Sequence, residues 1–573
     1  MSRVMAVAWR PHRGTSDGRS EMVDLQAALE GIERFVDERL PRSDAPGVVV
    51  ALTDREQLLG AVAVGMADVA AGRPVQLGDR FQIGSISKSF AAIIAMQEVE
   101  AGRLDLQAPV TDYVPWFEVR SRFAPITTHH LLTHTAGLIG GTDFGLDGVH
   151  QVWALRETEC VYAPGERFSY SNDGYKLVGL VLEATTGKPF TELLGERVLG
   201  PLGMRDSDPA ITLATRATVA LPHQRAFDDR PSHPTQPWMV SPWYETATAD
   251  GSIVSTASDM CTYARLLLAR GVAPRGRLFS AESWARLTRH AIEDLDEPGA
   301  WYGYGLITRE NDGRTLIGHS GSMVGYSSYV MIDPGAGLGV VVLMNGIADR
   351  TELVQYALEA GRAALAGAPM PPPPPPADPT VVDDAEAYAG AYRLCGGGAG
   401  GGGPGGALTL AASSGRLLLL ADGVEVALER RGPDVFVASH PDWDRHYLCA
   451  GRDAAGAVVE FFHGPDWYAG ARYEGSGGDA SRPEWRPFVG HYRSWNAMLP
   501  DLRVIERKGT LLLSGPWLDG PACKLELVPL GEALFRVGAE EWRPDRLSFD
   551  AIVEGRATRV LYNQAPLYRA FTP

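Results

Sequence analysis

The stretch Phe81-Gln82-Ile83-Gly84-Ser85-Ile86-Ser87-Lys88-Ser89-Phe90 decides how the rest of the chain is interpreted. It leads into an apolar run, residues 90–96, that predicts a buried helix, and Gly84 supplies the tight turn before it. Ser85 and Lys88 are three residues apart, so their side chains share one helix face. A serine hydroxyl becomes a useful nucleophile when a neighbouring base takes its proton, and a neutral lysine amine at this spacing can do so.

The lysine at position 88 is informative because the chain is rich in arginine and has only five lysines. An arginine cannot lose its proton inside a protein, whereas a lysine in a desolvated site can. A Ser-x-x-Lys spacing alone remains a weak signal. It also fits an ordinary helix start that carries a solvated lysine, so further motifs are needed.

Length and composition indicate a multidomain globular protein. The chain has 573 residues, 45% of them hydrophobic and 21% charged, and a net charge of −17. This length corresponds to roughly three or four domains. The negative charge argues against a nucleic-acid or anionic-membrane partner, and no segment approaches the roughly 18 apolar residues of a membrane-spanning helix. The five cysteines include no C-x-x-C pair, which disfavours a disulfide framework or structural zinc and favours a cytoplasmic location.

Two further polar stretches stand beside apolar segments. Tyr170 and Asn172 precede an apolar helix, and in extended backbone their side chains project to one side. Alone, this stretch also fits a turn with a packing tyrosine. His319 is followed by Ser320 and Gly321, which predicts a strand that other backbone approaches closely. Alone, His319 also fits an ordinary surface histidine.

Three histidines at positions 129, 130 and 134 raise the question of a metal site. His130 and His134 would lie one turn apart on a helix, but no glutamate accompanies them as in H-E-x-x-H, and no third ligand is evident. A structural helix is the better interpretation. We expect neither a metal site nor a cofactor.

The C-terminal part of the chain differs in composition and contains a repeat. A polyproline stretch, residues 371–376, separates it from the part before. The segment Tyr388-Ala389-Gly390-Ala391-Tyr392-Arg393 recurs as Phe488-Val489-Gly490-His491-Tyr492-Arg493, which predicts two copies of a small antiparallel β-barrel. A glycine tract, residues 395–406, is interpreted as a hairpin tip in the first copy.

These features predict five segments along the chain. We expect a disordered lead-in without a secretory signal (1–21), a mixed α and β hydrolase domain (22–366), a proline-rich linker (367–384), a first β-barrel (385–476) and a second (485–573).

The three motifs Ser85-Ile86-Ser87-Lys88, Tyr170-Ser171-Asn172 and His319-Ser320-Gly321 occur in an order that resembles the penicillin-recognising serine hydrolases. This family includes class C β-lactamases, D-alanyl-D-alanine carboxypeptidases, esterases and D-aminopeptidases. Two supporting stretches, residues 130–138 and 255–260, are similar as well, so the resemblance covers roughly residues 22–365. It implies a multidomain α+β fold, in which an antiparallel sheet flanked by helices is followed by two lipocalin-like β-barrels.

The resemblance also implies residue roles. Ser85 would form the acyl-enzyme, Lys88 would act as its base, and Tyr170 would carry protons to the leaving group and from the deacylating water. The backbone N–H groups of Ser85 and Ser322 would form the oxyanion hole, and Asn172 would hold the substrate amide. In the third motif, Ser320 and Gly321 would contact the bound substrate.

His319 is counted with Ser85, Lys88 and Tyr170 among the expected catalytic residues, although it departs from the family pattern. Typical β-lactamases and carboxypeptidases carry lysine there, which attracts a substrate carboxylate, whereas histidine is mostly neutral near pH 7. The histidine form resembles esterases and D-aminopeptidases. We therefore expect a serine hydrolase that cleaves a small ester or amide, with D-aminoacyl peptides or amides among the candidates.

Two alternatives stay open at this point. The enzyme could instead pass its acyl group to an amine, as peptide-cyclising relatives of penicillin-binding proteins do, or bind a ligand as a scaffold without turnover. The expected partners are a small-molecule or short-peptide substrate and further copies of the chain in a homo-oligomer. The resemblance to three-domain D-aminopeptidases also implies that a loop of the second barrel, with Trp517-Leu518-Asp519-Gly520 as one candidate, limits substrate size.

Overall fold

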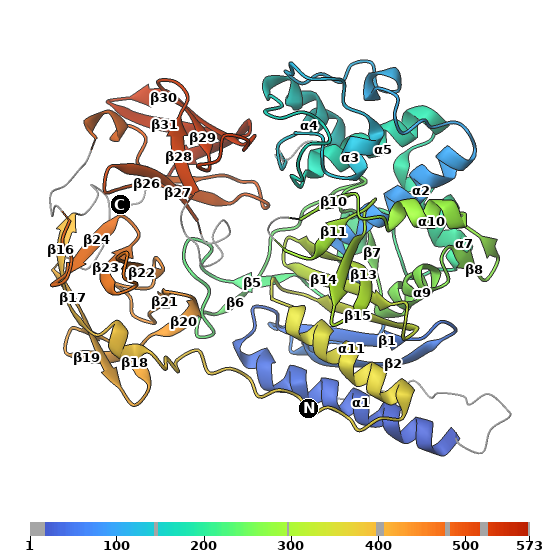
Figure 1. Ribbon diagram of the computed structural model, residues 1–573, viewed down its shortest axis with the longest axis horizontal. Coiled ribbons are helices and arrows are strands. Elements are labelled where there is room, and N and C mark those ends of the chain that lie inside the picture. The colour runs from blue at the N-terminus through green and yellow to red at the C-terminus, as the bar shows by residue number, and fades with distance from the viewer. Residues whose placement is uncertain are drawn as a thin grey trace. The chain divides into compact units, whose positions relative to one another are not determined.

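The computed structural model describes residues 18–141, 147–294, 297–396, 406–475, 482–515 and 525–570. The chain forms two compact units, each described here by itself (Figure 1). Unit 1 consists of Met1–Gln224 and Pro237–Pro375, and unit 2 consists of Arg225–Gln236 and Pro376–Pro573. The candidate loop at residues 517–520 lies outside the described residues, as do residues 1–17 of the lead-in and 397–405 of the glycine tract.

The core of unit 1 is a nine-stranded antiparallel sheet. Its strand order is β10 (Ile292–Glu293), β11 (Ala300–Tyr302), β12 (Ile307–Asn311), β13 (Arg314–Met323), β14 (Tyr326–Asp333), β15 (Leu338–Met344), β1 (Gly47–Thr53), β2 (Leu58–Asp68) and β3 (Arg73–Pro74). Three short strand pairs accompany it: β4 (Phe81–Gln82) with β7 (Val254–Ser255), β5 (His223–Arg225) with β6 (Trp238–Val240), and β8 (Val272–Ala273) with β9 (Gly276–Arg277).

The helices of unit 1 cover the sheet and extend beyond it (Figure 1). They are α1 (Gly18–Arg39), α2 (Ser87–Glu100), α3 (Thr128–Leu132), α4 (Gly148–Ala154), α5 (Asn172–Thr186), α6 (Phe190–Leu194), α7 (Gly200–Leu202), α8 (Leu213–Arg216), α9 (Ala257–Leu268), α10 (Ala281–Leu287) and α11 (Thr351–Ala366).

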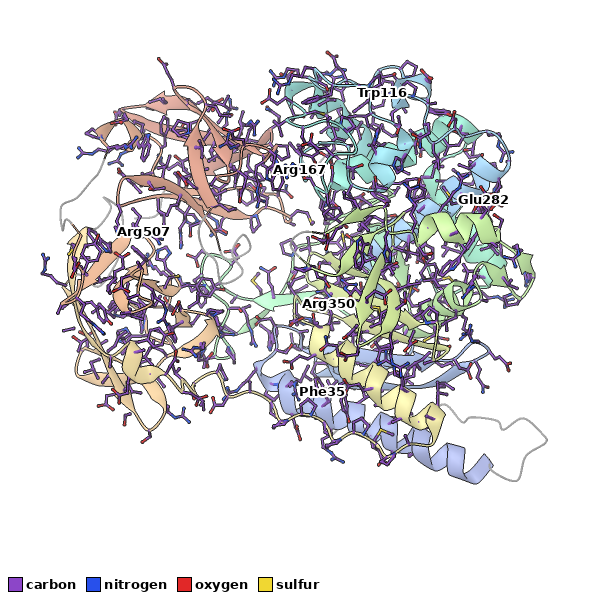
Figure 2. The ribbon with its side chains drawn as sticks, in the orientation of Figure 1. Phe35, Trp116, Arg167, Glu282, Arg350 and Arg507 are labelled. Atoms are coloured by element: carbon purple, nitrogen blue, oxygen red, sulfur yellow. The ribbon has the colours of Figure 1, made fainter. Side chains whose placement is uncertain are left out.

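Both faces of the central strand β1 are buried, because its residues alternate between two hydrophobic clusters. In β1, Val48 and Val50 face the cluster that includes α1 and α11, while Val49 and Ala51 face the larger cluster around α2 and α9. Phe35 of α1, labelled in Figure 2, stacks on Tyr356 of α11 with ring centroids 5.1 Å apart. Every residue of β1 is therefore apolar or small and buried.

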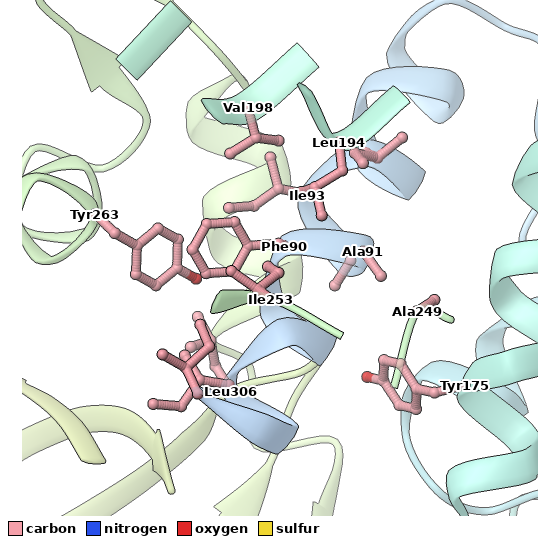
Figure 3. Close-up of a cluster of buried hydrophobic side chains, with 14 of the residues drawn as sticks. Phe90, Ala91, Ile93, Tyr175, Leu194, Val198, Ala249, Ile253, Tyr263 and Leu306 are labelled. Carbon is pink, nitrogen blue, oxygen red and sulfur yellow. The ribbon is translucent and has the colours of Figure 1, made fainter. Parts of the chain in front are cut away.

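Helix α2 runs through the middle of the larger cluster (Figure 3). Phe90 stacks on Tyr263 of α9 at a centroid distance of 4.0 Å, and both rings are fully buried. Burying a side chain of this size contributes about 1.5–3 kcal/mol. The buried helix predicted from residues 90–96 is confirmed, and its fixed position determines where the preceding turn lies.

Unit 2 consists of two antiparallel β structures, which confirms the predicted fold class. The first is a nine-stranded sheet in the order β19 (Val424–Ala427), β18 (Arg416–Ala421), β17 (Ala407–Ser413), β16 (Gly390–Gly396), β24 (Asp466–Gly470), β23 (Val458–His463), β22 (Leu448–Arg452), β21 (Val435–Val437) and β20 (Glu429–Gly432). The second is a closed barrel of β25 (Gly490–Arg493), β26 (Asp501–Arg507), β27 (Thr510–Ser514), β28 (Leu525–Pro529), β29 (Leu534–Val537), β30 (Arg546–Val553), β31 (Arg556–Tyr562) and β32 (Ala565–Arg569).

The predicted repeat is visible as the same local hydrogen bond in both copies. The Tyr392 hydroxyl donates to the carbonyl oxygen of Tyr388 at 2.8 Å, and the Tyr492 hydroxyl donates to that of Phe488 at 2.7 Å. Both tyrosines are buried. Each copy therefore begins with a tyrosine that folds back on the residue four positions before it.

Residues 225–236 were assigned from sequence to the hydrolase segment, yet they cluster with unit 2. Ion pairs hold them there: Arg493 with Asp228 at 2.7 Å, Arg230 with Asp444 at 3.0 Å, and Arg503 with Asp229 at 3.4 Å. The four cysteines among the described residues are free thiols. None of the helices described is both long and apolar enough to cross a membrane.

Candidate active site

Ser85 is the one partly exposed residue in the buried stretch 81–96. It lies in a 3-10 turn, Gly84–Ile86, that leads directly into α2. Gly84 has a left-handed φ of 52°, and a Cβ at this position would lie 2.6 Å from the carbonyl oxygen of Ser322. The turn therefore requires glycine, which lets Ser85 lie beside the backbone of β13.

Lys88 is fully buried, and its side-chain nitrogen lies among three hydrogen-bond acceptors. Its Nζ is 3.1 Å from Ser85 Oγ, 2.8 Å from Asn172 Oδ1 and 2.9 Å from the carbonyl oxygen of Asp250. The one-turn spacing thus brings Ser85 and Lys88 together, as the sequence predicted.

Tyr170 contributes a phenol to the same cluster. Its hydroxyl is hydrogen-bonded to Ser85, and burial raises the pKa of Tyr170 above its usual range, an effect that this hydrogen bond opposes. Lys88 Nζ lies 4.8 Å from the centroid of the Tyr170 ring. Ser85 therefore has both an amine and a phenol as hydrogen-bonding neighbours.

Asn172 is the first residue of α5, and local sequence explains its position. Ser171 caps the helix by accepting a hydrogen bond from the Gly174 N–H. The backbone N–H of Asn172 donates to Gly140 at 2.6 Å, which leaves the side-chain oxygen directed at Lys88. The Tyr170 ring and the Asn172 side-chain oxygen therefore both lie beside Lys88 Nζ.

The third motif lies on β13, directly against the turn of the first. A Cβ on Gly321 would lie 2.0 Å from the carbonyl oxygen of Ile83, which confirms the predicted close approach of backbone. The Ser322 backbone packs against Gly84, and a Cβ there would lie 2.7 Å from the Ser322 nitrogen. The backbone N–H groups of residues 85 and 322 are thus in the same neighbourhood, while Ser320 is half-buried.

His319 is buried and has two hydrogen-bond partners. Its Nδ1 lies 2.5 Å from the carbonyl oxygen of Ser320, so Nδ1 carries the proton and donates. Its Nε2 lies 3.0 Å from the Tyr302 hydroxyl, which donates to the neutral ring. Burial is the main cause that lowers the pKa of His319 to about 3; the hydrogen bond to the Ser320 carbonyl opposes this shift, and the nearby Lys88, Arg309 and Arg350 (labelled in Figure 2) contribute to it.

Tyr302 was not identified from the sequence. It ends β11 and belongs to the run Trp301-Tyr302-Gly303-Tyr304-Gly305, in which aromatic residues alternate with glycine. Gly305 has a φ of 67°, and a Cβ there would lie 2.8 Å from the carbonyl oxygen of Lys88. The glycine spacing was the available signal, because it indicates close backbone approach.

The predicted helix through the three histidines is wrong at its end. Helix α3 stops at Leu132, and His134 has a left-handed φ of 55°. His130 and His134 are therefore not one helical turn apart. The His130 ring hydrogen-bonds Thr127 at the helix start, whereas His134 turns toward Tyr170.

A second buried lysine, Lys176, interacts with acidic residues beside the site. Lys176 Nζ lies 3.0 Å from Asp173 and 3.9 Å from Asp250 Oδ2, and Thr248 donates to the other Asp250 oxygen at 2.5 Å. This network fixes the residue whose backbone carbonyl accepts from Lys88. The arrangement as a whole suits nucleophilic attack by a hydroxyl that has an amine able to accept its proton and a phenol able to donate one.

Comparison with known proteins agrees with this geometry. The family described as Beta-lactamase matches residues 32–360. Penicillin-binding protein 4 of Amycolatopsis lactamdurans is 32% identical over 328 residues, covering 55% of this chain and 84% of that protein. Esterase EstB of Burkholderia gladioli is 31% identical over 209 residues, covering 32% of this chain and 52% of that one. The structure of the octameric penicillin-binding protein homologue from Pyrococcus abyssi has a TM-score of 0.55 and 25% identity, covering 78% of this chain and 99% of that one.

Proposed function

Because the chain belongs to the beta-lactamase family, we propose that it is a serine hydrolase that forms an acyl-enzyme on Ser85 and cleaves small esters or amides. The observation that carries the proposal is the position of the partly exposed Ser85 hydroxyl, 3.1 Å from Lys88 Nζ and hydrogen-bonded to Tyr170.

In this proposal Lys88 and Tyr170 share the work of moving protons. As Ser85 attacks the substrate carbonyl, its proton passes to Lys88, and Tyr170 delivers a proton to the leaving group. In deacylation the Tyr170 phenolate then takes a proton from the attacking water, and Lys88 returns its proton to Ser85 Oγ, which restores all three groups. General acid–base assistance of this kind typically contributes about 10²–10⁴-fold to the rate.

The oxyanion of the tetrahedral intermediate would be held by the backbone N–H groups of Ser85 and Ser322. This assignment is supported by the packing of the Ser322 backbone against the Gly84 turn, which precedes Ser85 directly. Donors of this type contribute about 3 kcal/mol each to the transition state. Asn172, Ser320 and Gly321 would contact the rest of the substrate.

The neutral His319 limits the substrate class. A ring with a pKa of about 3 carries no charge at neutral pH, so it does not attract a carboxylate as a lysine would. We therefore propose substrates without a free carboxylate at this position, namely small neutral esters or amides, with D-aminoacyl amides as the amide class to examine first.

The test compares the wild type with Ser85→Ala on p-nitrophenyl esters and D-aminoacyl p-nitroanilides. We expect the wild type to hydrolyse at least one substrate class, Ser85→Ala to be inactive, and a fluorophosphonate to label the wild type alone. Ser322→Ala is the matched control, because it keeps the backbone N–H and should retain activity. Full turnover by Ser85→Ala would refute the proposal.

Product analysis decides the direction of deacylation. Free acid supports hydrolysis, whereas an aminolysed or cyclic product would show acyl transfer. Because one similar structure is described as octameric, we also propose that this chain forms a homo-oligomer, which light scattering of the purified protein tests.

A further inference from the structure

His134 lies directly behind Tyr170 and adopts an unusual backbone conformation. Its φ of 55° is left-handed, a region that about a few per cent of non-glycine residues occupy, histidine more often than most. The residue is buried, with 1% of its surface exposed. Strained positions of this kind gather at functional sites, so the contacts of His134 are of interest.

Two backbone hydrogen bonds connect His134 to the residues on either side of Tyr170. The Ser169 N–H donates to the carbonyl oxygen of His134 at 2.8 Å. The Ser171 N–H donates to the ring nitrogen Nδ1 of His134 at 3.0 Å. One residue thus holds the chain before and after the tyrosine.

The ring of His134 also contacts the tyrosine itself. The centroids of the His134 and Tyr170 rings are 4.1 Å apart with an interplanar angle of 31°. The rings of Tyr302 and His319 are farther from Tyr170, both at 6.4 Å. Of these three neighbours, His134 makes the closest ring contact.

The hydrogen bond from Ser171 also fixes the tautomer of His134. Because Nδ1 accepts, the neutral ring carries its proton on Nε2. Burial lowers the pKa of His134 well below its ordinary value, with further contributions from Lys88 and His319. Within the residues that the structure describes, Nε2 has no hydrogen-bond partner. The ring also packs against Tyr302 and Tyr175, at centroid distances of 4.8 and 5.0 Å, so its hydrogen bond to Ser171 and its closest ring contact are both with the Tyr170 segment.

We propose that His134 is the residue that positions Tyr170, holding it on three sides so that its hydroxyl meets Ser85. This inference rests on the proposed function, since it assigns His134 to the proton transfer that Tyr170 performs there. His134 touches neither substrate nor the reacting atoms, and it acts through Tyr170. A displacement of about 1 Å at such a group can lower a rate about 100-fold.

The experiment uses the full-length protein and a p-nitrophenyl ester that the wild type hydrolyses and Ser85→Ala does not. His134→Ala removes both the ring and the acceptor, and we expect kcat to fall about 100-fold with KM within about threefold of the wild type. His134→Asn keeps a side-chain acceptor for the Ser171 N–H and tolerates the left-handed backbone. Its kcat should therefore be about tenfold higher than that of His134→Ala. His134→Phe keeps a ring without the acceptor and should recover less.

The matched control is His130→Asn. His130 lies on the same segment, but its ring caps α3 through Thr127. We expect this variant to lower the melting temperature without a change in kcat. A melting curve for each variant shows whether it is folded, and His134→Asn provides the folded comparison should His134→Ala not fold.

A double-mutant cycle separates positioning from a general structural effect. If His134 acts through Tyr170, adding His134→Asn to Tyr170→Phe should lower kcat by no more than about twofold further. The inference is overturned if the two effects multiply, or if folded His134 variants keep kcat within threefold of the wild type. The proposed function is tested separately, because it depends on the comparison of the wild type with Ser85→Ala and not on any His134 variant.

Discussion

Replacing Lys88 by arginine tests whether the site needs a group that can lose its proton or merely a positive charge. Lys88 is fully buried, and its Nζ has acceptors at 2.8, 2.9 and 3.1 Å. Arginine keeps the charge but cannot be deprotonated, and its planar fork does not place one nitrogen among three converging acceptors. The Lys88→Arg variant should therefore lose the base.

The magnitude follows from the role assigned to the base. Loss of general-base assistance lowers the rate roughly 100- to 10,000-fold, which corresponds to about 3–5 kcal/mol of transition-state stabilisation. Lys88→Met adds a stability effect, because two part-buried acceptors, Asn172 Oδ1 and the Asp250 carbonyl oxygen, then lose the lysine donor. Each unsatisfied acceptor costs about 1–3 kcal/mol of stability. The variant regains part of this loss, because it no longer has to bury the amine of a lysine.

The assay is stopped-flow acylation by a p-nitrophenyl ester, with kcat/KM measured alongside and unfolding followed in denaturant. Lys188→Arg is the control, since Lys188 is exposed and pairs with Glu192 and Glu196 on the surface, and its activity should not change. Should Lys88→Arg retain more than about a tenth of the wild-type kcat/KM, the base role of Lys88 would be refuted.

Three further predictions concern pH, the third motif and the tail. Burial depresses the pKa of His134 and His319 in the folded protein, whereas these histidines take up protons below about pH 6.5 in the unfolded chain. Denaturant titrations should therefore show the free energy of unfolding falling below that pH, by up to about 1.4 kcal/mol per pH unit for each histidine. A flat profile between pH 7 and 5.5 would contradict this. Tyr302→Phe removes the donor to His319 Nε2 and should cost about 1–3 kcal/mol in the same titrations, while an unchanged free energy of unfolding would show that the hydrogen bond is not formed. Deleting residues 485–573 should widen the range of accepted substrates if the second barrel limits their size, and unchanged specificity in a folded truncation would assign the tail to stability or assembly.

The parts of the fold predicted from sequence are those that local chemistry decides. An apolar run after a glycine turn gave the buried α2, because its residues 90–96 can only be accommodated inside a core. The repeat at Tyr392 and Tyr492 gave the two β structures of unit 2, since equal sequences form equal hydrogen bonds. The spacing of Ser85 and Lys88 needed only helix geometry.

The parts that sequence missed depend on contacts between distant segments. The backbone of His134 leaves the helix because Ser169 and Ser171, more than thirty residues later, bind it there. No local pattern marks Tyr302 as the partner of His319, and the lysine at position 176 meets Asp250 only in the folded protein. Residues 225–236 join unit 2 through arginine–aspartate pairs whose partners lie more than two hundred residues away.

The protonation states of the groups around Tyr170 explain how histidine can replace lysine in the third motif. Three basic groups face the Tyr170 ring, with His134 at 4.1 Å, Lys88 Nζ at 4.8 Å and His319 at 6.4 Å. Burial lowers the pKa of both histidines, and Lys88 lowers each of them further. A second positive charge at position 319 would lie in the same desolvated cluster and oppose the first. With both histidine rings neutral, Lys88 and Tyr170 are the neighbours of Ser85 to which we assign the proposed proton transfers.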